Sequence, residues 1–259
     1  IARKIIKALN VTGPFNIQYI ATENQLKVIE CNLRASRSFP FVSKVTRHPF
    51  IEIAAKALLK KGKKEAYETL DIDFVGVKTA QFSYARLKGS NPVAHVEMAS
   101  TGEVACLGSN LFEAFLQSWL AADQTIEGKR LLVSIGGDKK LKLLPMVKQL
   151  YNQGWELFAT EGTHAFLAKN GIASTFLYKG SEGKEPSVMT TIQQKEVDLI
   201  VNIPRNSEPY SDGFKIRRLA IECKVPLITN LQVGMLMLTA LNQVDINKIA
   251  PKAWQEYVK

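Results

Sequence analysis

Oxygen-bearing side chains and arginines lie close together near the start of the chain. Gln18, Glu30 and Asn32 are followed by Arg34 and Arg37. Glu30 and Asn32 are two residues apart, so they point to the same face of an extended strand. Carboxylate and amide oxygens suit Mg²⁺, which usually shares its coordination shell with substrate phosphates. The two arginines would then supply positive charge to a phosphoryl group.

The length of one turn decides whether these oxygens meet. Two apolar runs, residues 15–21 and 26–31, flank a polar tip, which is the pattern of a hairpin. A three-residue loop, residues 23–25, pairs Gln18 with Glu30 and gathers the three oxygen-bearing side chains on one face. A two-residue loop would shift the pairing by one and separate them. On spacing alone, a surface hairpin with scattered polar residues is the more frequent explanation.

A second set of polar side chains follows five apolar runs in the C-terminal half, and each run is expected to be a strand. The polar groups are Ser134 with residues 136–140, residues 160–163, Lys179, Asn202, and Thr229 with Asn230. Carboxyl ends of parallel strands meet at one edge of a sheet, and a helix N-terminus there favours an anion. The set predicts one phosphate-sized pocket, although each residue alone is as easily a helix cap or a solvated charge.

The expected order of strands and helices also predicts that these strand ends meet at one edge. Strands expected at 131–135, 155–159, 175–178, 199–203 and 226–228 alternate with helices at 141–152, 164–169, 187–195, 213–223 and 231–242. This alternation predicts an α/β domain with a parallel sheet covered on both faces. Glu127–Gly128 marks its start. Upstream, we expect helices at 2–9, 49–59 and 112–121, a strand at 74–80, and a loop at 97–104.

The composition limits the class of protein and the kind of partner. The chain has 259 residues, a net charge of +10 and 46% hydrophobic residues. This excludes wholesale disorder and suggests an anionic partner. Cys31, Cys106 and Cys223 are far apart and form no CxxC motif, which is typical of a reducing cytoplasm.

Neither a membrane span nor a secretory signal is expected. The uncharged stretch at 225–244 contains Pro226 and several amides, so it predicts a buried strand, a turn and a helix. The chain begins inside a basic amphipathic run, IARKIIKAL, and not at a methionine, which suggests a piece of a longer protein.

The run from Phe15 through VIECNLRASRSFPFVSK (residues 28–44), with EMASTGEV (residues 97–104), resembles the large subunit of carbamoyl phosphate synthetase. The resemblance covers essentially the whole chain. It implies that residues 1–60 are the end of the second ATP-grasp unit, which in the family phosphorylates carbamate. Residues 61–127 would be a connecting α+β region, and residues 128–259 a methylglyoxal-synthase-like allosteric domain. The implied fold class is an incomplete ATP-grasp segment followed by a Rossmann-like domain with a five-stranded parallel sheet.

The resemblance also implies roles for the first cluster. Gln18, Glu30 and Asn32 fall on the family's metal-ligand positions, and Arg34 and Arg37 on its phosphate-contacting arginines. The implied cofactors are Mg²⁺ or Mn²⁺ with ATP, and K⁺ as an optional ion. The family's nucleotide-binding lysine, glycine-rich lid and adenine pocket lie upstream, so the chain alone is expected to be inactive.

In the allosteric domain the resemblance implies a nucleotide effector. In nucleotide-regulated members its phosphate is held at positions matching Lys140, Thr160, Thr163 and Lys179, with Asn202 lining the same pocket. UMP is the preferred expectation and a purine nucleotide such as IMP the second. The urea-cycle enzymes, which depend on acetylglutamate, carry an aromatic residue in place of Lys179, so the lysine argues against that effector.

Two departures weaken parts of this assignment. Pro204 replaces a threonine that would donate a hydroxyl to the nucleoside, and Thr79 replaces the glutamate of ornithine-activated enzymes. The implied partners are the rest of the large subunit, a glutamine amidotransferase subunit or domain, and further copies in an oligomer. No nucleic-acid or membrane partner is expected, and the location is expected to be cytoplasmic.

Three other functions remain as alternatives. A methylglyoxal-synthase-like lyase would need the GGD motif after its fourth strand, whereas Gly136–Asp138 follows the first. A basic nucleic-acid-binding module would explain the charge, but there is no aromatic-interleaved basic face, and Arg217 and Arg218 are as readily salt-bridged or interdomain groups. Hydrolase chemistry has little support, because His48, His95 and His164 have no recognisable nucleophile motif.

Overall fold

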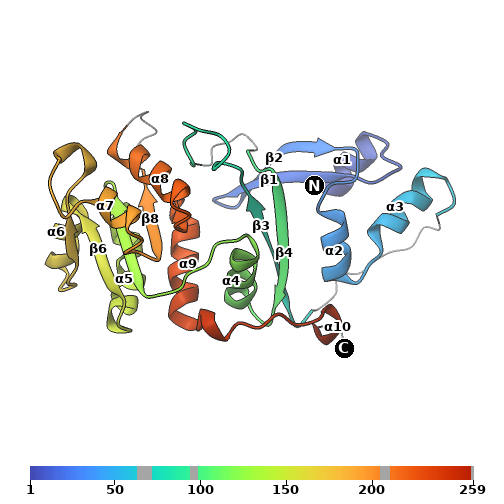
Figure 1. Cartoon of the computed structure of the whole chain (residues 1–259). Coiled ribbons are helices and arrows are strands. Elements are labelled where there is room, and N and C mark those ends of the chain that lie inside the picture. Colours follow the sequence, from blue (N-terminus) through green and yellow to red (C-terminus); the bar gives the residue numbers. More distant parts are fainter. Residues whose placement is uncertain (63–71, 94–98, 205–210, 258–259) are drawn as a thin grey trace. The chain divides into compact units, whose positions relative to one another are not determined.

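The computed structural model describes residues 1–62, 72–93, 99–204 and 211–257, and these fall into two compact units (Figure 1). The first unit runs from Ile1 to Asp73 and the second from Phe74 to Lys259. Residues 74–127 therefore share a unit with the domain expected from residue 128 onward. His95 lies outside the described ranges, as do Glu97 and Met98 at the start of the loop expected at 97–104.

The first unit contains three helices and one hairpin in its described part. Their bounds are α1 Ala2–Ala8, β1 Asn16–Thr22, β2 Gln25–Asn32, α2 Phe39–Thr46 and α3 Phe50–Leu58. The helix α2 was not among the expected helices. Pro40 lies in the first turn of α2, where its missing N–H costs nothing.

The hairpin corrects the predicted loop while keeping the predicted pairing. Thr22 pairs with Gln25, so the turn has only two residues, Glu23 and Asn24, which have φ of 50° and 60°. Such left-handed pairs match the twist of hairpin strands. Gln18 nevertheless pairs with Glu30, because a β-bulge next to Gln18 absorbs one residue of β2 and restores the register.

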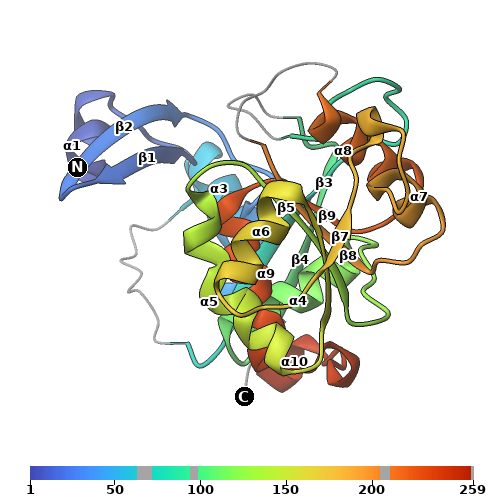
Figure 2. The same ribbon diagram turned by 90° about the vertical axis from the view of Figure 1, so that its left-hand side faces the viewer.

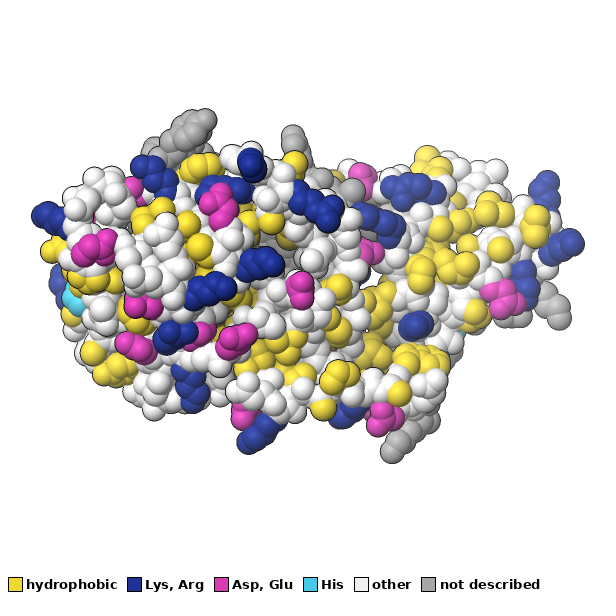
Figure 3. All heavy atoms as spheres, in the orientation of Figure 1, with side chains coloured by type: hydrophobic (Ala, Val, Ile, Leu, Met, Phe, Trp, Pro, Cys, Tyr) yellow, Lys and Arg dark blue, Asp and Glu magenta, His cyan; other side chains and the backbone are white. Residues whose placement is uncertain are grey.

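No described side chain of the first unit is fully buried. Hydrophobic side chains instead reach the surface over its helices (Figure 3). The hairpin exposes Ile20, Leu26, Val28 and Ile29 by 44–55% of their surface. A two-stranded hairpin is marginally stable without a packed face, so this unit lacks a core of its own among its described residues.

The second unit begins with a small antiparallel sheet and then forms the parallel one. Its first elements are β3 Val75–Gln81, β4 Gly102–Gly108 and α4 Leu111–Ala121. The expected loop at 97–104 therefore ends inside a strand, because residues 102–104 pair with β3. The polar ASTG sequence suggested a loop, but pairing with β3 decides the conformation.

The five-stranded parallel sheet confirms the expected α/β fold. Its strands follow the order β7-β6-β5-β8-β9. Their bounds are β5 Arg130–Ile135, β6 Glu156–Thr160, β7 Thr175–Leu177, β8 Leu199–Ile203 and β9 Leu227–Ile228. The intervening helices are α5 Lys139–Asn152, α6 Glu161–Lys169, α7 Val188–Gln193, α8 Asp212–Glu222 and α9 Leu231–Gln243, followed by α10 Trp254–Tyr257.

Helices cover both faces of this sheet (Figure 2). On β5, Leu131, Val133 and Ile135 face one hydrophobic core, which includes side chains of α4, α5 and α9. Leu132 faces the other core, which includes side chains of α7 and α8. The alternation of β5 residues thus builds a three-layer domain, with α4 of the upstream segment packed into one of its cores.

An ion pair holds the first residue of the parallel sheet, Arg130, against the residue before β8, Asp198. Asp198 accepts hydrogen bonds from Arg130 N, Nε and Nη2 at 2.9, 2.9 and 2.7 Å. A Cβ at Gly128 would lie 2.5 Å from Asp198 Oδ2, so this position needs glycine. None of the described helices is long and apolar enough to cross a bilayer.

Gly108→Ala should destabilise the second unit by about 2 kcal/mol or more, because overpacking forces backbones apart. The added Cβ would lie 2.4 Å from Ala114 N, where β4 meets α4. Gly102→Ala on the same strand is the control, since its nearest atom, Gln81 Cβ, is 3.7 Å away. Urea denaturation of both variants should separate them, and equal stabilities would contradict the tight β4–α4 packing.

Candidate functional site

The oxygen-bearing side chains of the first unit do gather on one face of the hairpin. Asn32 Nδ2 donates to Glu30 Oε1 at 2.8 Å and lies 3.3 Å from Asn16 Oδ1. Gln18 pairs with Glu30 across the strands. Because Asn32 uses its amide nitrogen in these bonds, its carbonyl oxygen is left for a cation. Asn16, a member of this face, was not predicted.

The face contains only one carboxylate. In the described part of the chain no group of three or more His, Cys, Asp or Glu side chains could hold a metal ion. Glu30 with the Gln18 and Asn32 amides is therefore a partial donor set. Mg²⁺ commonly accepts such a set, because water and substrate phosphates complete its octahedral shell.

The two arginines lie beyond the end of β2 and are exposed. Asn16 Nδ2 donates to Arg34 O at 3.4 Å, which ties the backbone of Arg34 to the oxygen-bearing face. The Arg34 side chain donates to Ala35 O and lines a groove of about 600 Å³. Leu9, Leu33 and Leu58 also line this groove, so its surface is largely apolar. Arg37 precedes α2.

In the second unit, polar side chains meet at the carboxyl edge of the parallel sheet. Ser134 on β5 pairs with Asn202 on β8. Thr160 Oγ1, at the end of β6, donates to Ser134 Oγ at 3.2 Å. The chain order changes direction between β5 and β8, which is where α/β sheets commonly bind ligands. Three neighbouring strands thus contribute to one polar row, Thr160, Ser134 and Asn202.

Thr163 and Lys140 join this row from two helices. Thr163 is 3% exposed, and its Oγ1 accepts from Ile135 N at 3.2 Å. Lys140 Nζ donates to Gly162 O at 2.8 Å, which brings the first turns of α5 and α6 together. Desolvation by burial lowers the pKa of Lys140 from its ordinary value. An anion beside Lys140 would offset this penalty on the charged form.

Within the described ranges, Lys179 makes no hydrogen bond to the polar row. It follows β7, the edge strand next to β6, and its backbone N–H donates to Glu182 Oε1 at 3.1 Å. The structure therefore groups Lys140, Thr160, Thr163 and Asn202, and places Lys179 one strand further along the same edge.

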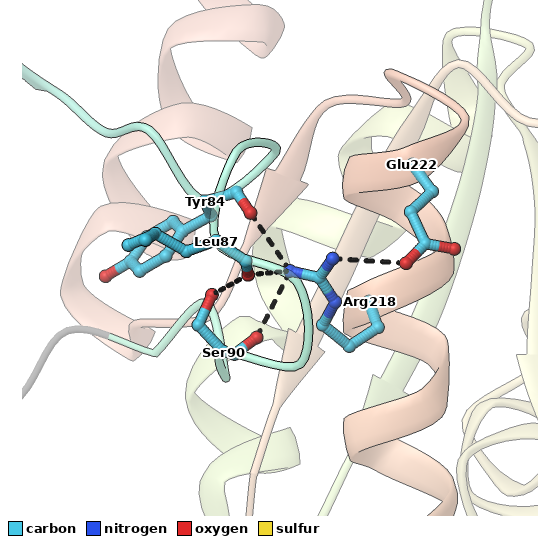
Figure 4. A network of polar contacts seen from close by, with 5 residues as sticks. All are labelled: Tyr84, Leu87, Ser90, Arg218 and Glu222. Atoms are coloured by element: carbon cyan, nitrogen blue, oxygen red, sulfur yellow. Dashed lines mark hydrogen bonds and ion pairs between the residues drawn. The ribbon is translucent and has the colours of Figure 1, made fainter.

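Two arginines on α8 have roles at this edge that the sequence did not specify. Arg217 is 1% exposed and donates from Nη1 to Asn202 Oδ1 at 2.8 Å. Arg218 forms an ion pair with Glu222 at 3.1 Å and donates to three carbonyl oxygens of residues 84–90 (Figure 4). The pair of adjacent arginines in a helical stretch was the only signal in the sequence.

The remaining sequence expectations can be placed as well. Thr79 Oγ1 lies 2.6 Å from Ser118 Oγ, a contact between β3 and α4. Gly136–Asp138 follows β5, the first strand of the parallel sheet, and Gly137 has φ of 64°. His164 Nδ1 lies 2.9 Å from Ser174 Oγ.

Comparisons with known proteins agree with the two-part organisation. Residues 1–64 match the family model described as carbamoyl-phosphate synthase L chain, ATP binding domain, and residues 142–229 match the MGS-like domain. A solved methylglyoxal synthase from Elizabethkingia anophelis aligns with a TM-score of 0.38 at 17% identity, over 51% of this chain and 90% of that one. The fold assignment rests on the sheet itself and on the family models.

Curated relatives match almost the whole chain. "Multifunctional protein URA2" of Saccharomyces cerevisiae is 46% identical over 93% of this chain and 11% of its own length. "Carbamoyl-phosphate synthase [ammonia], mitochondrial" of Homo sapiens is 40% identical over 93% of this chain and 17% of its own length. The chain thus spans about a tenth to a sixth of these relatives. It belongs to the carbamoyl-phosphate synthase large-chain family, as a segment that joins part of the ATP-binding domain to an MGS-like domain.

Proposed function

We propose that this chain supplies two parts of a carbamoyl-phosphate synthase. The first unit provides the metal- and phosphate-facing edge of the ATP site that phosphorylates carbamate. The second unit binds a nucleotide effector at the carboxyl edge of its parallel sheet. The full synthase would make carbamoyl phosphate from bicarbonate, glutamine-derived ammonia and two ATP, for pyrimidine and arginine biosynthesis.

The shared face of Gln18, Glu30 and Asn32 carries the proposal for the ATP site. The donor set fits Mg²⁺ or Mn²⁺ at the edge of a phosphate-binding site, with Glu30 as the charged ligand. Such an ion would supply positive charge that neutralises the phosphate oxygens. Arg34 and Arg37 would hold the transferred phosphoryl group by charge-assisted hydrogen bonds. K⁺ would be an additional ion of the full enzyme.

The exposed apolar surface of the first unit supports a role as part of a larger domain. Its hairpin and the groove beside Arg34 present Leu9, Leu26, Val28, Ile29 and Leu33 to the outside. Large exposed apolar patches usually mark interfaces. We infer that the rest of the ATP-grasp domain covers them, and that the isolated chain does not turn over ATP. A glutamine amidotransferase subunit or domain would deliver the ammonia.

The proposed effector site rests on the convergence of Lys140, Thr160, Thr163 and Asn202. Hydroxyls, an amide and a desolvated ammonium suit a phosphate monoester with an adjoining sugar. Lys179 would reach the phosphate from the neighbouring strand end. UMP is the preferred ligand, as the end product of pyrimidine synthesis, and IMP the alternative.

Glu30→Gln in the full-length synthase should slow ATP formation from carbamoyl phosphate and MgADP by about a hundredfold or more. This is the order of loss when one electrostatic contact to a transition state is removed. Glu23→Gln in the turn of the same hairpin is the control and should keep the parental rate. A Glu30→Gln enzyme with parental rate and parental Mg²⁺ dependence would contradict the metal assignment.

Lys179→Ala should weaken UMP or IMP binding roughly ten- to hundredfold, because it deletes one charge-assisted contact of about 1.5 to 3 kcal/mol. Isothermal titration calorimetry of the 259-residue chain measures this. Lys184→Ala is the matched control, since Lys184 lies over the Tyr178 ring, 5.5 Å from its centroid, and outside the row. Absence of binding to the unmodified chain at millimolar UMP and IMP would remove the effector assignment.

A further inference from the structure

Arg217 is a buried cation for which the described part of the chain supplies no acidic partner. It is the largest side chain that is almost fully buried, at 1% exposure. The ion pairs of the described residues do not include it. Burial lowers the pKa of Arg217, yet a guanidinium stays charged at physiological pH. A lone buried charge is costly, so its surroundings must compensate it with dipoles.

Two asparagine side chains supply these dipoles. Arg217 Nη1 donates to Asn202 Oδ1 at 2.8 Å, and Nε donates to Asn91 Oδ1 at 2.9 Å. The remaining nitrogen, Nη2, is buried and has no hydrogen-bond partner among the residues that the structure describes. Asn202 belongs to the polar row at the sheet edge, whereas Asn91 belongs to the segment upstream of the parallel sheet. Arg217 therefore connects two sites that are far apart in the sequence.

This connection fixes the orientation of the Asn202 amide. A guanidinium only donates hydrogen bonds, so Asn202 must turn its oxygen toward Arg217. Its amide nitrogen then faces the other way, and within the described ranges no protein atom accepts from it. Asn202 pairs with Ser134, whose hydroxyl accepts from Thr160. The Asn202 N–H groups thus border the row that would hold the effector.

The same helix also holds residues 84–93. Arg218 Nη1 donates to the carbonyl oxygens of Tyr84, Leu87 and Ser90 at 3.1, 3.3 and 3.3 Å (Figure 4). Thr229 Oγ1, after β9, donates to Pro92 O at 3.3 Å. The segment is thus attached to α8 and the sheet edge by polar contacts, and Asn91 links it to the row through Arg217.

We propose that Arg217 is a positioning residue for the effector site. It holds Asn202 as a hydrogen-bond donor to an acceptor oxygen of the nucleotide, and it couples occupancy of the site to the stability of residues 84–93. This inference rests on the effector site proposed above. Coupling of this kind is reciprocal, so a ligand that fixes Asn202 also strengthens the attachment of Asn91.

Calorimetric titration of the 259-residue chain with UMP and IMP tests the positioning role. Arg217→Met should weaken binding at least tenfold, because Asn202 is then free to turn its oxygen toward the ligand. Lys215→Met removes one charge from an exposed position of the same helix and should change the affinity less than twofold. Unchanged affinity in a folded Arg217→Met chain would overturn the inference.

Asn202→Asp provides a test that does not depend on Arg217 being replaceable. A carboxylate should pair with Arg217 and raise the melting temperature without ligand, because the buried charge gains a counterion. The same change removes the amide donors and repels phosphate, so UMP and IMP binding should be lost. A variant that gains no thermal stability, or that binds the nucleotide as the unmodified chain does, would contradict the assigned amide orientation.

Hydrogen exchange tests the coupling. UMP should slow amide exchange within residues 84–93 of the unmodified chain, and Asn91→Ala should abolish this ligand-dependent protection while binding persists. Protection that persists in Asn91→Ala, or that is absent from the unmodified chain while UMP binds, would overturn the coupling alone. Failure of every nucleotide to bind the unmodified chain would instead remove the effector site and this inference together.

Discussion

The Arg217 guanidinium is buried at the carboxyl edge of the parallel sheet, and its burial constrains the groups around it. A charge that is 1% exposed must be solvated by protein dipoles, and two amides from distant segments provide them. Asn202 supplies one from the sheet, and Asn91 supplies the other from the segment that precedes it. Because both amides solvate the same cation, the upstream segment is held against the parallel sheet. We propose that the effector binds at this sheet.

The surrounding structure reinforces this attachment. The side chain of Arg218 donates to three carbonyl oxygens of residues 84–90, so this part of the segment is held through its backbone (Figure 4). Apolar contacts act in parallel, since Phe115, Leu116 and Trp119 of α4 belong to a core of the parallel sheet. Residues 74–127 therefore belong to the same compact unit as the MGS-like domain.

In the first unit, the polar contacts are organised but the described apolar side chains are not packed into a core. Its described residues build a hairpin with an organised polar face, but they bury no apolar side chain completely. The position of Gln18 opposite Glu30 depends on a bulge in β2, which offsets the two-residue turn. Sites next to active centres often use bulges to aim side chains. A polar face on an uncovered hairpin is the arrangement expected of one side of a binding site. Residues from other parts of the sequence would form the other sides.

Much of the parallel sheet could be predicted because its signals are local. Continuous apolar runs separated by helical periodicity indicated β5, β6 and β8 to within a residue or two, and the ends of those runs indicated the polar row. The family assignment was equally accessible, because motifs such as VIECNLR are contiguous. Glu30 and Asn32 were placed on one face by strand geometry alone.

The tertiary structure decided what depends on contacts between distant residues. The hairpin register required a bulge that no local residue pattern indicated, and β4 became a strand because β3 pairs with it. The role of Arg217 could not be predicted, because Asn91 and Asn202 lie 126 and 15 residues away. The sequence alone thus determined the fold class, the family and the edge at which polar groups collect. Three-dimensional packing decided how one buried charge orients an amide at that edge, because the cost of burying a charge depends on every group around it.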